Sequence, residues 1–285
     1  MESYSSKGVK MLFGLSPEPK QGKILEQTKV FSEAYRKVDI VNLFTMWDSR
    51  DIMLEAFSNK VNMVIQNDYI PMVSWYLNTS NVETTPPNVC DLVTQGHYDE
   101  YISKFLSSLS PESEMYLRLN HEPNVVGRHY NDPKNFIKVW NYLAPRIRKA
   151  LPKAKLTWCA NDNDLSSPKF EEYMVEDVDY VGFDSYKWSN VGPTEFNFIE
   201  PMRRIKAISS KPIIVSEFGT RFFKKEGGKV YIDEVTKYLE NEGVFASLYF
   251  NGYDPGMMCM IVKDKTFRPD LNYLFAQEVD NYLVR

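Results

Sequence analysis

MYLRLNHEPN (residues 115–124) and KPIIVSEFGT (residues 211–220) share one pattern, an apolar run that ends in a glutamate, Glu122 or Glu217. Runs of this length, rich in branched and aromatic residues and bounded by Pro, Gly and Asn, are typical of buried strands. Each glutamate therefore stands where a strand meets a loop. If both strands belong to one parallel barrel, both carboxylates point into one pocket at its carboxyl end.

Strand-like and helix-like runs alternate along the whole chain. Strands are expected at residues 8–16, 38–47, 70–78, 115–124, 155–161, 178–186, 211–220 and 245–253. Helices are expected at 23–37, 51–67, 97–109, from about 133 onward, and at 168–176, 198–208, 229–241 and 271–282. Strands that alternate with helices indicate a parallel sheet.

Eight strand–helix units of about 36 residues each predict a (β/α)8 TIM barrel, which belongs to the α/β class. No linker or low-complexity segment interrupts the chain, so residues 1–285 are expected to form one domain. A doubly wound open sheet is the alternative. That fold typically carries a glycine-rich turn after its first strand, whereas residues 14–19 here read GLSPEP.

Composition excludes several classes of protein. Hydrophobic residues make up 43% of the chain and the formal net charge is −4, with no run of Lys or Arg, so we expect no nucleic-acid partner. No apolar run reaches 18 residues, so we expect no membrane partner. Cys90, Cys159 and Cys259 are odd in number and widely spaced, which predicts neither a disulfide framework nor a metal site.

The start of the chain lacks the apolar stretch of a signal peptide. We therefore expect a protein that is cytoplasmic, or secreted with its leader removed. We also expect a monomer without a cofactor.

The period of two in a strand places Arg118, Asn120 and Glu122 on one side of the strand at 115–124. If that side faces the barrel interior, Arg118 needs a partner, either a carboxylate at the rim or Asn120, because a buried unpaired guanidinium is costly. The residues alone leave open that Arg118 points outward, into a helix contact.

The same period places Ile213, Val215 and Glu217 on one side of the strand at 211–220. Two branched core residues would then lead up to an acid at the barrel mouth. Enzymes that cleave glycosidic bonds typically use a pair of carboxylates that face each other across such a mouth. One ionised carboxylate attacks the anomeric carbon, and the other, protonated, gives its proton to the leaving oxygen.

Several motifs, in order along the chain, resemble glycoside hydrolase clan A, and most closely family 26, known for β-mannanases and some β-glucanases. The similar segments are residues 71–75 (PMVSW), 96–102 (GHYDEYI), 117–122 (LRLNHE), Trp158 with Asn161, 181–186 (VGFDSY) and 212–219 (PIIVSEFG). This resemblance implies a retaining endo-acting hydrolase of β-1,4-linked mannan or mixed-linkage β-1,3-1,4-glucan.

The resemblance also implies roles for individual residues. Glu122 would be the acid/base and Glu217 the nucleophile. His121 would hydrogen-bond near the nucleophile and the sugar, and Tyr186 would hold Glu217 through its hydroxyl. The residues alone also allow His121 to be a core histidine and Tyr186 to be a packing residue at the rim.

Further side chains are expected to shape the floor and the sugar-binding subsites: Arg118, Trp75, Asn161, Tyr249 and Trp188. Trp75 could instead be a core residue. The family often has a tryptophan on its eighth strand that stacks under the sugar; here residues 248–253 read LYFNGY, and Tyr249 or Phe250 is the expected substitute.

The chain departs from the family after His121–Glu122. The family continues with Met-Asn-Gly and a nearby Trp, whereas residues 123–129 read PNVVGRH and add Arg128 and His129 close to Glu122. These differences motivate a second hypothesis, a carbohydrate-binding barrel without catalysis. A third, a metal-dependent hydrolase, requires clustered ligands, but the chain has only three histidines and no His-x-His spacing.

Overall fold

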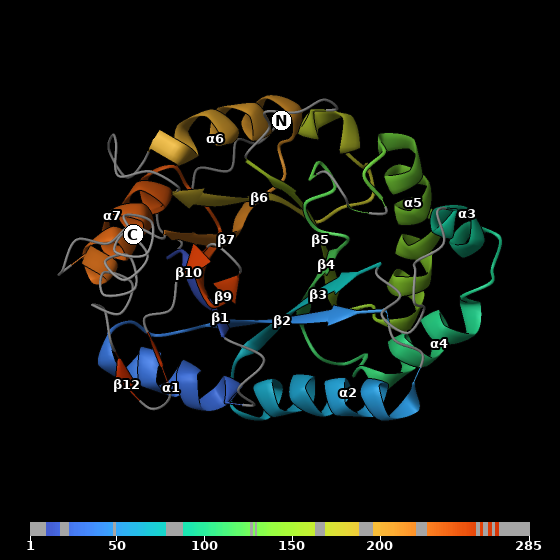
Figure 1. Ribbon diagram of the computed structural model, residues 1–285, viewed down its shortest axis with the longest axis horizontal. Helices are drawn as coiled ribbons and strands as arrows, with labels where there is room; N and C mark the ends of the chain where they lie inside the picture. Colours follow the sequence, from blue (N-terminus) through green and yellow to red (C-terminus); the bar gives the residue numbers. More distant parts are fainter. Residues whose placement is uncertain are drawn as a thin grey trace, which may run out of the picture.

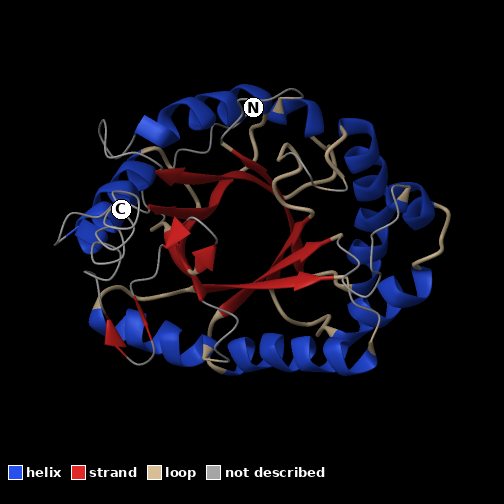
Figure 2. Ribbon diagram, viewed as in Figure 1, coloured by secondary structure: helices blue, strands red, loops and turns tan. Residues whose placement is uncertain are grey.

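The computed structural model describes residues 10–17, 23–47, 50–77, 88–125, 128, 130–162, 169–187, 196–220, 227–254, 257–258, 262–263 and 266–267. Within them, eight parallel strands pair in chain order and close into a barrel. Helices run around the outside of the strands (Figures 1 and 2). The predicted (β/α)8 barrel is confirmed, and the open-sheet alternative is wrong, because the first strand pairs with the eighth.

The barrel strands are β1 Leu12–Pro17, β2 Ile40–Met46, β3 Ile70–Tyr76, β4 Met115–Leu119, β5 Ala154–Asn161, β6 Tyr180–Lys187, β7 Ile213–Thr220 and β8 Ala246–Asn251. The helices are α1 Ile24–Ala34, α2 Asp51–Gln66, α3 Val89–Thr94, α4 Asp99–Ser108, α5 Pro133–Ala150, the 3-10 turn η2 Phe170–Tyr173, α6 Phe196–Ile208 and α7 Gly227–Asn241. The expected strands and helices are present, apart from the helix at 271–282, which lies outside the described residues.

Three features were not predicted. The α3 helix is additional, and two short antiparallel pairs follow β8: β9 Tyr253–Asp254 with β10 Met257–Met258, and β11 Val262–Lys263 with β12 Thr266–Phe267. The last pair lies beside α1, where Phe267 packs on Phe31 and Tyr35. Short pairs of this kind carry too few residues for a clear period-2 signal.

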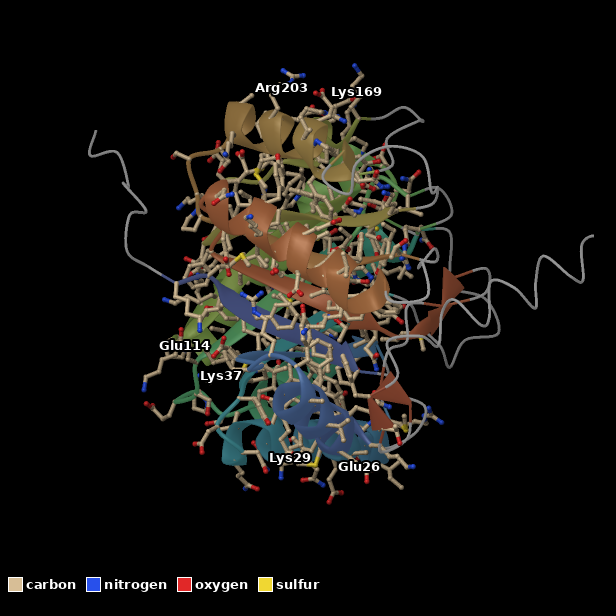
Figure 3. The ribbon with its side chains drawn as sticks, turned by 90° about the vertical axis from the view of Figure 1, so that its left-hand side faces the viewer. Glu26, Lys29, Lys37, Glu114, Lys169 and Arg203 are labelled. Atoms are coloured by element: carbon tan, nitrogen blue, oxygen red, sulfur yellow. The ribbon has the colours of Figure 1, made fainter. Side chains whose placement is uncertain are left out.

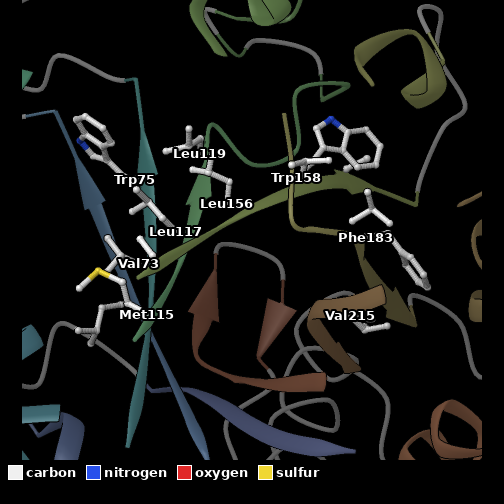
Figure 4. Packing of buried hydrophobic residues seen from close by; sticks show 14 of the residues in the cluster. Val73, Trp75, Met115, Leu117, Leu119, Leu156, Trp158, Phe183 and Val215 are labelled. Carbon is white, nitrogen blue, oxygen red and sulfur yellow. The ribbon is translucent and has the colours of Figure 1, made fainter. Parts of the chain in front are cut away.

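The barrel strands bury two separate apolar layers. The larger cluster lies between strands and helices and includes Trp75 and Leu119, which Figure 4 shows with their neighbours on β3 and β4. The smaller cluster fills the lower barrel interior with Ile40, Met72, Tyr116, Ile214, Ala246 and Leu248. Because side chains alternate along a strand, the interior positions above this cluster are fixed in advance.

On β7 this alternation is broken. Val215 pairs with Phe183 of β6, but the next pair joins Glu217 to Asp184, so Ser216 is an extra residue. Bulges of this kind re-aim side chains and are frequent beside active sites. The expectation that Ile213, Val215 and Glu217 share one face is therefore wrong. Ile213 and Val215 belong to the outer layer, and the bulge turns Glu217 inward.

Gly182 on β6 makes room for this irregular stretch. A Cβ at this position would lie 1.9 Å from the carbonyl oxygen of Ile214, a backbone atom on β7. The neighbouring strand can approach β6 this closely only where no side chain stands between them.

The charged side chains gather on the outside of the molecule. Glu26 and Lys29 of α1 and Arg203 of α6 project from opposite sides of the helical ring (Figure 3). The first turn of α5 is capped: the Asp132 side chain accepts a hydrogen bond from the Asn135 backbone N–H, and Pro133 follows Asp132. Among the described residues, no helix combines the length and apolarity needed to span a bilayer.

We predict that Gly182→Ala is destabilising by about 2 kcal/mol or more, since the new methyl group would displace the backbone of β7. The free energy of unfolding, measured by urea denaturation, tests this. Lys149→Ala on the exposed face of α5 is the control and should change stability by less than about 0.5 kcal/mol. Equal stability of Gly182→Ala and the unmodified protein would contradict the close approach of the two strands.

Candidate active site

The chain that leaves β4 is bent sharply by two residues with positive φ, Asn120 at 44° and Glu122 at 53°. Such values are uncommon outside glycine and persist where surrounding contacts hold them. The Asn120 side chain accepts the Leu77 N–H at 2.8 Å, and the Glu122 N–H donates to the Cys159 carbonyl at 2.9 Å. The strand ends at Leu119, so the period-2 expectation does not extend to Glu122.

Both oxygens of Glu122 accept hydrogen bonds from neighbouring side chains. Asn161 Nδ2 lies 2.6 Å from Oε1, and Arg128 Nη2 lies 3.0 Å from Oε2. Asn124 braces this arrangement through two bonds with the Asn161 backbone, at 2.8 and 2.9 Å. The loop after β4 is thereby joined to the end of β5, which fixes the position of Glu122.

Glu217 is held by two donors from below and beside it. The Tyr186 hydroxyl lies 2.5 Å from Oε2, which is the contact expected, and Arg118 Nη2 donates to Oε1. Burial raises the pKa of Glu217; the Arg118 charge and the Tyr186 hydrogen bond act against this rise, and the charge of Glu122 adds to it. β4 and β7 run parallel in one closed barrel, so both glutamates lie at the mouth formed by the carboxyl ends of the strands.

Arg118 lies inside the barrel and is fully buried, with the carboxylate partners that its position requires. Its Nη1 lies 2.9 and 3.0 Å from the two oxygens of Asp184, while Nη2 contacts Glu217. Burial acts to lower the pKa of Arg118, but the two carboxylates outweigh it and raise the pKa well above its usual value. The residue is therefore a permanent cation between two acids.

A chain of polar side chains continues from Arg118 across the barrel interior. Arg118 Nε donates to Ser74 Oγ at 2.8 Å, Ser74 donates to Asn42 Oδ1 at 2.7 Å, and Asn42 donates to Ser16 Oγ at 3.0 Å. These residues come from four neighbouring strands, β4, β3, β2 and β1. Each polar side chain in this row thus has a partner, as a low-dielectric interior requires.

Cys159 closes the other side of the network. Its thiol donates to Asp184 Oδ1 at 3.1 Å, and burial together with the Asp184 charge raises its pKa well above the usual value. Cys159 therefore stays a neutral thiol that donates to the acid. Cys90 is also buried and forms no disulfide with any other described residue, and Cys259 lies outside the described residues.

His121 is a neutral imidazole at the barrel mouth. Its ring is packed edge-to-face against Phe44 and Tyr76, with centroids 5.8 and 5.2 Å away. Burial lowers its pKa well below 6.5, and the charges of Arg118 and Arg128 add to this effect. Nδ1 is buried and makes no hydrogen bond to any described residue.

Two of the expected site residues, Trp75 and Tyr249, lie away from this site in the described structure. Trp75 lies in the outer layer, stacked between Trp47 and Phe105, and its indole donates to Tyr101. Tyr249 is buried in the same layer. Trp188 lies outside the described residues, as does His129.

The eighth strand instead contributes Phe250. Its ring is perpendicular to Tyr186, 5.9 Å away, and also meets Phe44 at 6.4 Å. Of the two residues expected to replace the stacking tryptophan, the structure therefore places Phe250, and not Tyr249, among the site residues.

Five residues at the site had received no role from the sequence: Phe44, Tyr76, Asn124, Arg128 and Asp184. Counting by two along each strand would have found three of them, because Asn42 leads to Phe44, Ser74 to Tyr76 and Gly182 to Asp184. Nothing in the sequence pattern announces Asn124 and Arg128, which follow an irregular turn.

Within the described part of the chain, no group of His, Cys, Asp or Glu is arranged to hold a metal ion. The acids at the site are instead matched with guanidinium, amide and hydroxyl donors. This arrangement suits proton transfer and nucleophilic attack by carboxylates.

No protein-family model matches the chain, and no curated protein sequence matches it. Several solved structures share its fold. They include a GH26 β-mannanase from Bacteroides ovatus (TM-score 0.67, 12% identity, covering 95% of this chain and 89% of that one) and the Bacillus subtilis mannanase BCman (0.62, 12%, 91% and 90%). A GH128 endo-β-1,3-glucanase from Sorangium cellulosum is similar to the same degree (0.62, 13%, 92% and 97%).

At these identities the likeness shows a shared (β/α)8 barrel. The structural neighbours are glycoside hydrolases of clan A, in agreement with the resemblance read from the motifs.

We predict that His121 makes the stability of the protein fall as the pH falls below about 6.5. The folded state keeps the imidazole neutral while the unfolded chain takes up a proton, so the free energy of unfolding loses up to about 1.4 kcal/mol per pH unit. His121→Gln should flatten this dependence in urea denaturation between about pH 7.5 and 5.5. The exposed His97→Gln is the control, and an equal flattening in it would contradict the assignment.

We also predict that Asp184→Asn costs about 3 kcal/mol or more of stability, because it removes one carboxylate from a buried guanidinium. The exposed pair of Asp177 with Arg148 provides the comparison, and Asp177→Asn should cost less than about 1 kcal/mol. Urea denaturation of both variants measures the difference. Similar losses would show that Arg118 does not depend on Asp184.

Proposed function

We propose that this protein is a retaining endo-β-glycanase that hydrolyses β-1,4-linked mannan or mixed-linkage β-1,3-1,4-glucan. The observation that carries the proposal is the difference between two carboxylates at one barrel mouth. Glu217 is fixed by Arg118 and Tyr186, donors that favour its ionised form. Glu122 is held by Asn161 and Arg128 at the rim.

The proposed hydrolysis has two halves. Glu217 attacks the anomeric carbon while the glycosidic bond breaks and the leaving oxygen takes the proton of Glu122. In the second half, Glu122 takes a proton from water, the water oxygen bonds to the anomeric carbon, and Glu217 leaves as a carboxylate. The Tyr186 hydroxyl and Arg118 hold the nucleophile in one orientation through both halves, which lowers the entropy cost of the attack.

His121 and the aromatic rings serve substrate binding in this proposal. The neutral imidazole offers Nδ1, which has no partner in the described structure, to a sugar hydroxyl. Phe250, Phe44 and Tyr76 supply ring faces and edges beside it. The choice of mannan or glucan is motivated by the mannanase and glucanase neighbours, and it is the part of the proposal that an assay on both polymers decides.

We predict that Glu217→Ala lowers kcat on an aryl β-glycoside by about a thousandfold or more, and that sodium azide restores turnover and yields an α-glycosyl azide. Azide restores activity because it occupies the space of the missing nucleophile. Glu217→Gln, which fills that space, is the matched control and should not be rescued.

Full activity of the unmodified protein without rescue of Glu217→Ala would overturn the nucleophile assignment. Binding of mannan or mixed-linkage glucan without release of reducing ends would favour the alternative, a non-catalytic carbohydrate-binding barrel.

A further inference from the structure

Arg128 is the residue of the site that the proposed chemistry does not use. It follows β4 and pairs with Glu122, and its side chain keeps 31% of its surface exposed. Its Nε is nevertheless buried and makes no hydrogen bond to any described residue. The guanidinium fork, which suits bidentate binding of a carboxylate, is thus only partly occupied.

The pair of Arg128 and Glu122 conflicts with the work of a proton donor. A guanidinium has donors and no acceptor, so it favours the ionised carboxylate and offers no place for a carboxyl proton. Asn161 is different, because rotation of its amide by half a turn presents an acceptor to a protonated Glu122. Release of Oε2 by Arg128 would therefore remove the donor that competes with a proton on Glu122.

The charges at the site show that Arg128 needs another anionic partner once Glu122 carries a proton. The site holds three acids, Glu122, Glu217 and Asp184, and two guanidiniums. Arg118 is already engaged with Asp184 and Glu217. Once Glu122 is protonated, Arg128 has no anion of its own at the barrel mouth, and a partly buried cation without a partner is costly.

We propose that Arg128 binds the carboxylate of a uronic acid residue on the leaving-group side of the cleaved bond, so that the substrate is an acidic β-glycan. This inference rests on the proposed hydrolysis. The leaving-group side is the side of Glu122, because this residue protonates the departing oxygen. The substrate carboxylate replaces Glu122 as the partner of Arg128 and thereby frees the glutamate to hold its proton.

Tyr76 is placed to take part in this recognition. Its ring lies edge-to-face against His121, the neighbour of Glu122 in the chain. Burial raises the pKa of Tyr76 above the usual value, against the opposing charge of Arg128, so the phenol keeps its proton and can donate to a carboxylate. An arginine fork with an adjacent phenol is a recognition set for carboxylates that a neutral sugar would not satisfy.

Matched polymers test the inference. β-Mannan and mixed-linkage β-glucan are each compared with the same polymer after partial oxidation of its primary hydroxyls to carboxylates. The unmodified protein should have a kcat/KM about tenfold or more higher on the oxidised form of its polymer, the effect of one charge-assisted ion pair. Mass spectrometry should find a uronic acid at the non-reducing end of the released fragments, because that sugar was next to the cleaved bond.

Two variants separate charge from fork geometry. Arg128→Gln should lose the preference and the end-group pattern, because its kcat/KM falls more on the oxidised polymer than on the neutral one. Arg128→Lys should keep part of the preference. The control is Arg203→Gln on the exposed face of α6, which should leave both rates unchanged.

The outcomes distinguish this inference from the proposed function. Equal rates on neutral and oxidised polymers, with uronic acids scattered through the products, would overturn the inference and leave the hydrolase intact. An equal loss on both polymers in Arg128→Gln would also overturn it. Failure of the unmodified, folded protein to cleave any of the four polymers would instead overturn the proposed function. The end-group pattern of the unmodified protein decides the matter even if Arg128→Gln does not fold.

Discussion

One buried guanidinium holds the upper half of this barrel together. Arg118 donates to Asp184 and Glu217 and passes its hydrogen bonding on to Ser74, so it joins β3, β4, β6 and β7 in the barrel interior. Burying Arg118 without a partner would cost too much free energy for the fold to be stable. Without the guanidinium between them, the carboxylates of Asp184 and Glu217 would repel each other. The three charged groups therefore stabilise one another only when all are present, and Arg118 fixes the orientation of Glu217.

The bulge on β7 makes that set geometrically available. In an unbroken strand, Glu217 would share the outward direction of Val215 and lie under the helices. The extra residue, Ser216, shifts the register by one, and Gly182 on the neighbouring strand leaves room for the displaced backbone. The bulge thus places Glu217 above the apolar cluster of the barrel interior, which includes Ile214.

The barrel could be predicted because a strand-like run followed by a helix-like run recurs eight times. An error in the bounds of one element does not change the number of strand–helix units. The period of two and the cost of burial also predicted that Arg118, if it faced the interior, would pair with an acid or with Asn120. The orientation of Trp75 and Tyr249 was missed for the opposite reason. A large aromatic ring is compatible with either face of a barrel strand, so the residue type does not decide its direction. Ser74 and Leu248 face the interior, and the residues that follow them, Trp75 and Tyr249, therefore face outward.

The loop after β4 is the hardest part to read from the sequence. Positive φ at Asn120 and Glu122 breaks the period that would place the side chains. The bonds that compensate this strain come from Leu77, just after β3, and from Cys159 of β5. Non-local contacts of this kind leave no local pattern. That is why Arg128 could be noted as a polar neighbour of Glu122 but not as its ion-pair partner.

The two carboxylates differ most in what surrounds them, and this difference is what separates their chemistry. Glu217 is 6% exposed and bound by groups that cannot leave, since Arg118 is fully buried and Tyr186 is held from behind by Asn197 of α6. Glu122 is bound by an amide that can rotate and by an arginine that still reaches solvent. A nucleophile benefits from an unchanging environment, whereas a proton carrier must alternate between two states with different hydrogen-bonding needs. The rigid interior and the adjustable rim of the barrel supply these two environments to residues only a few side chains apart.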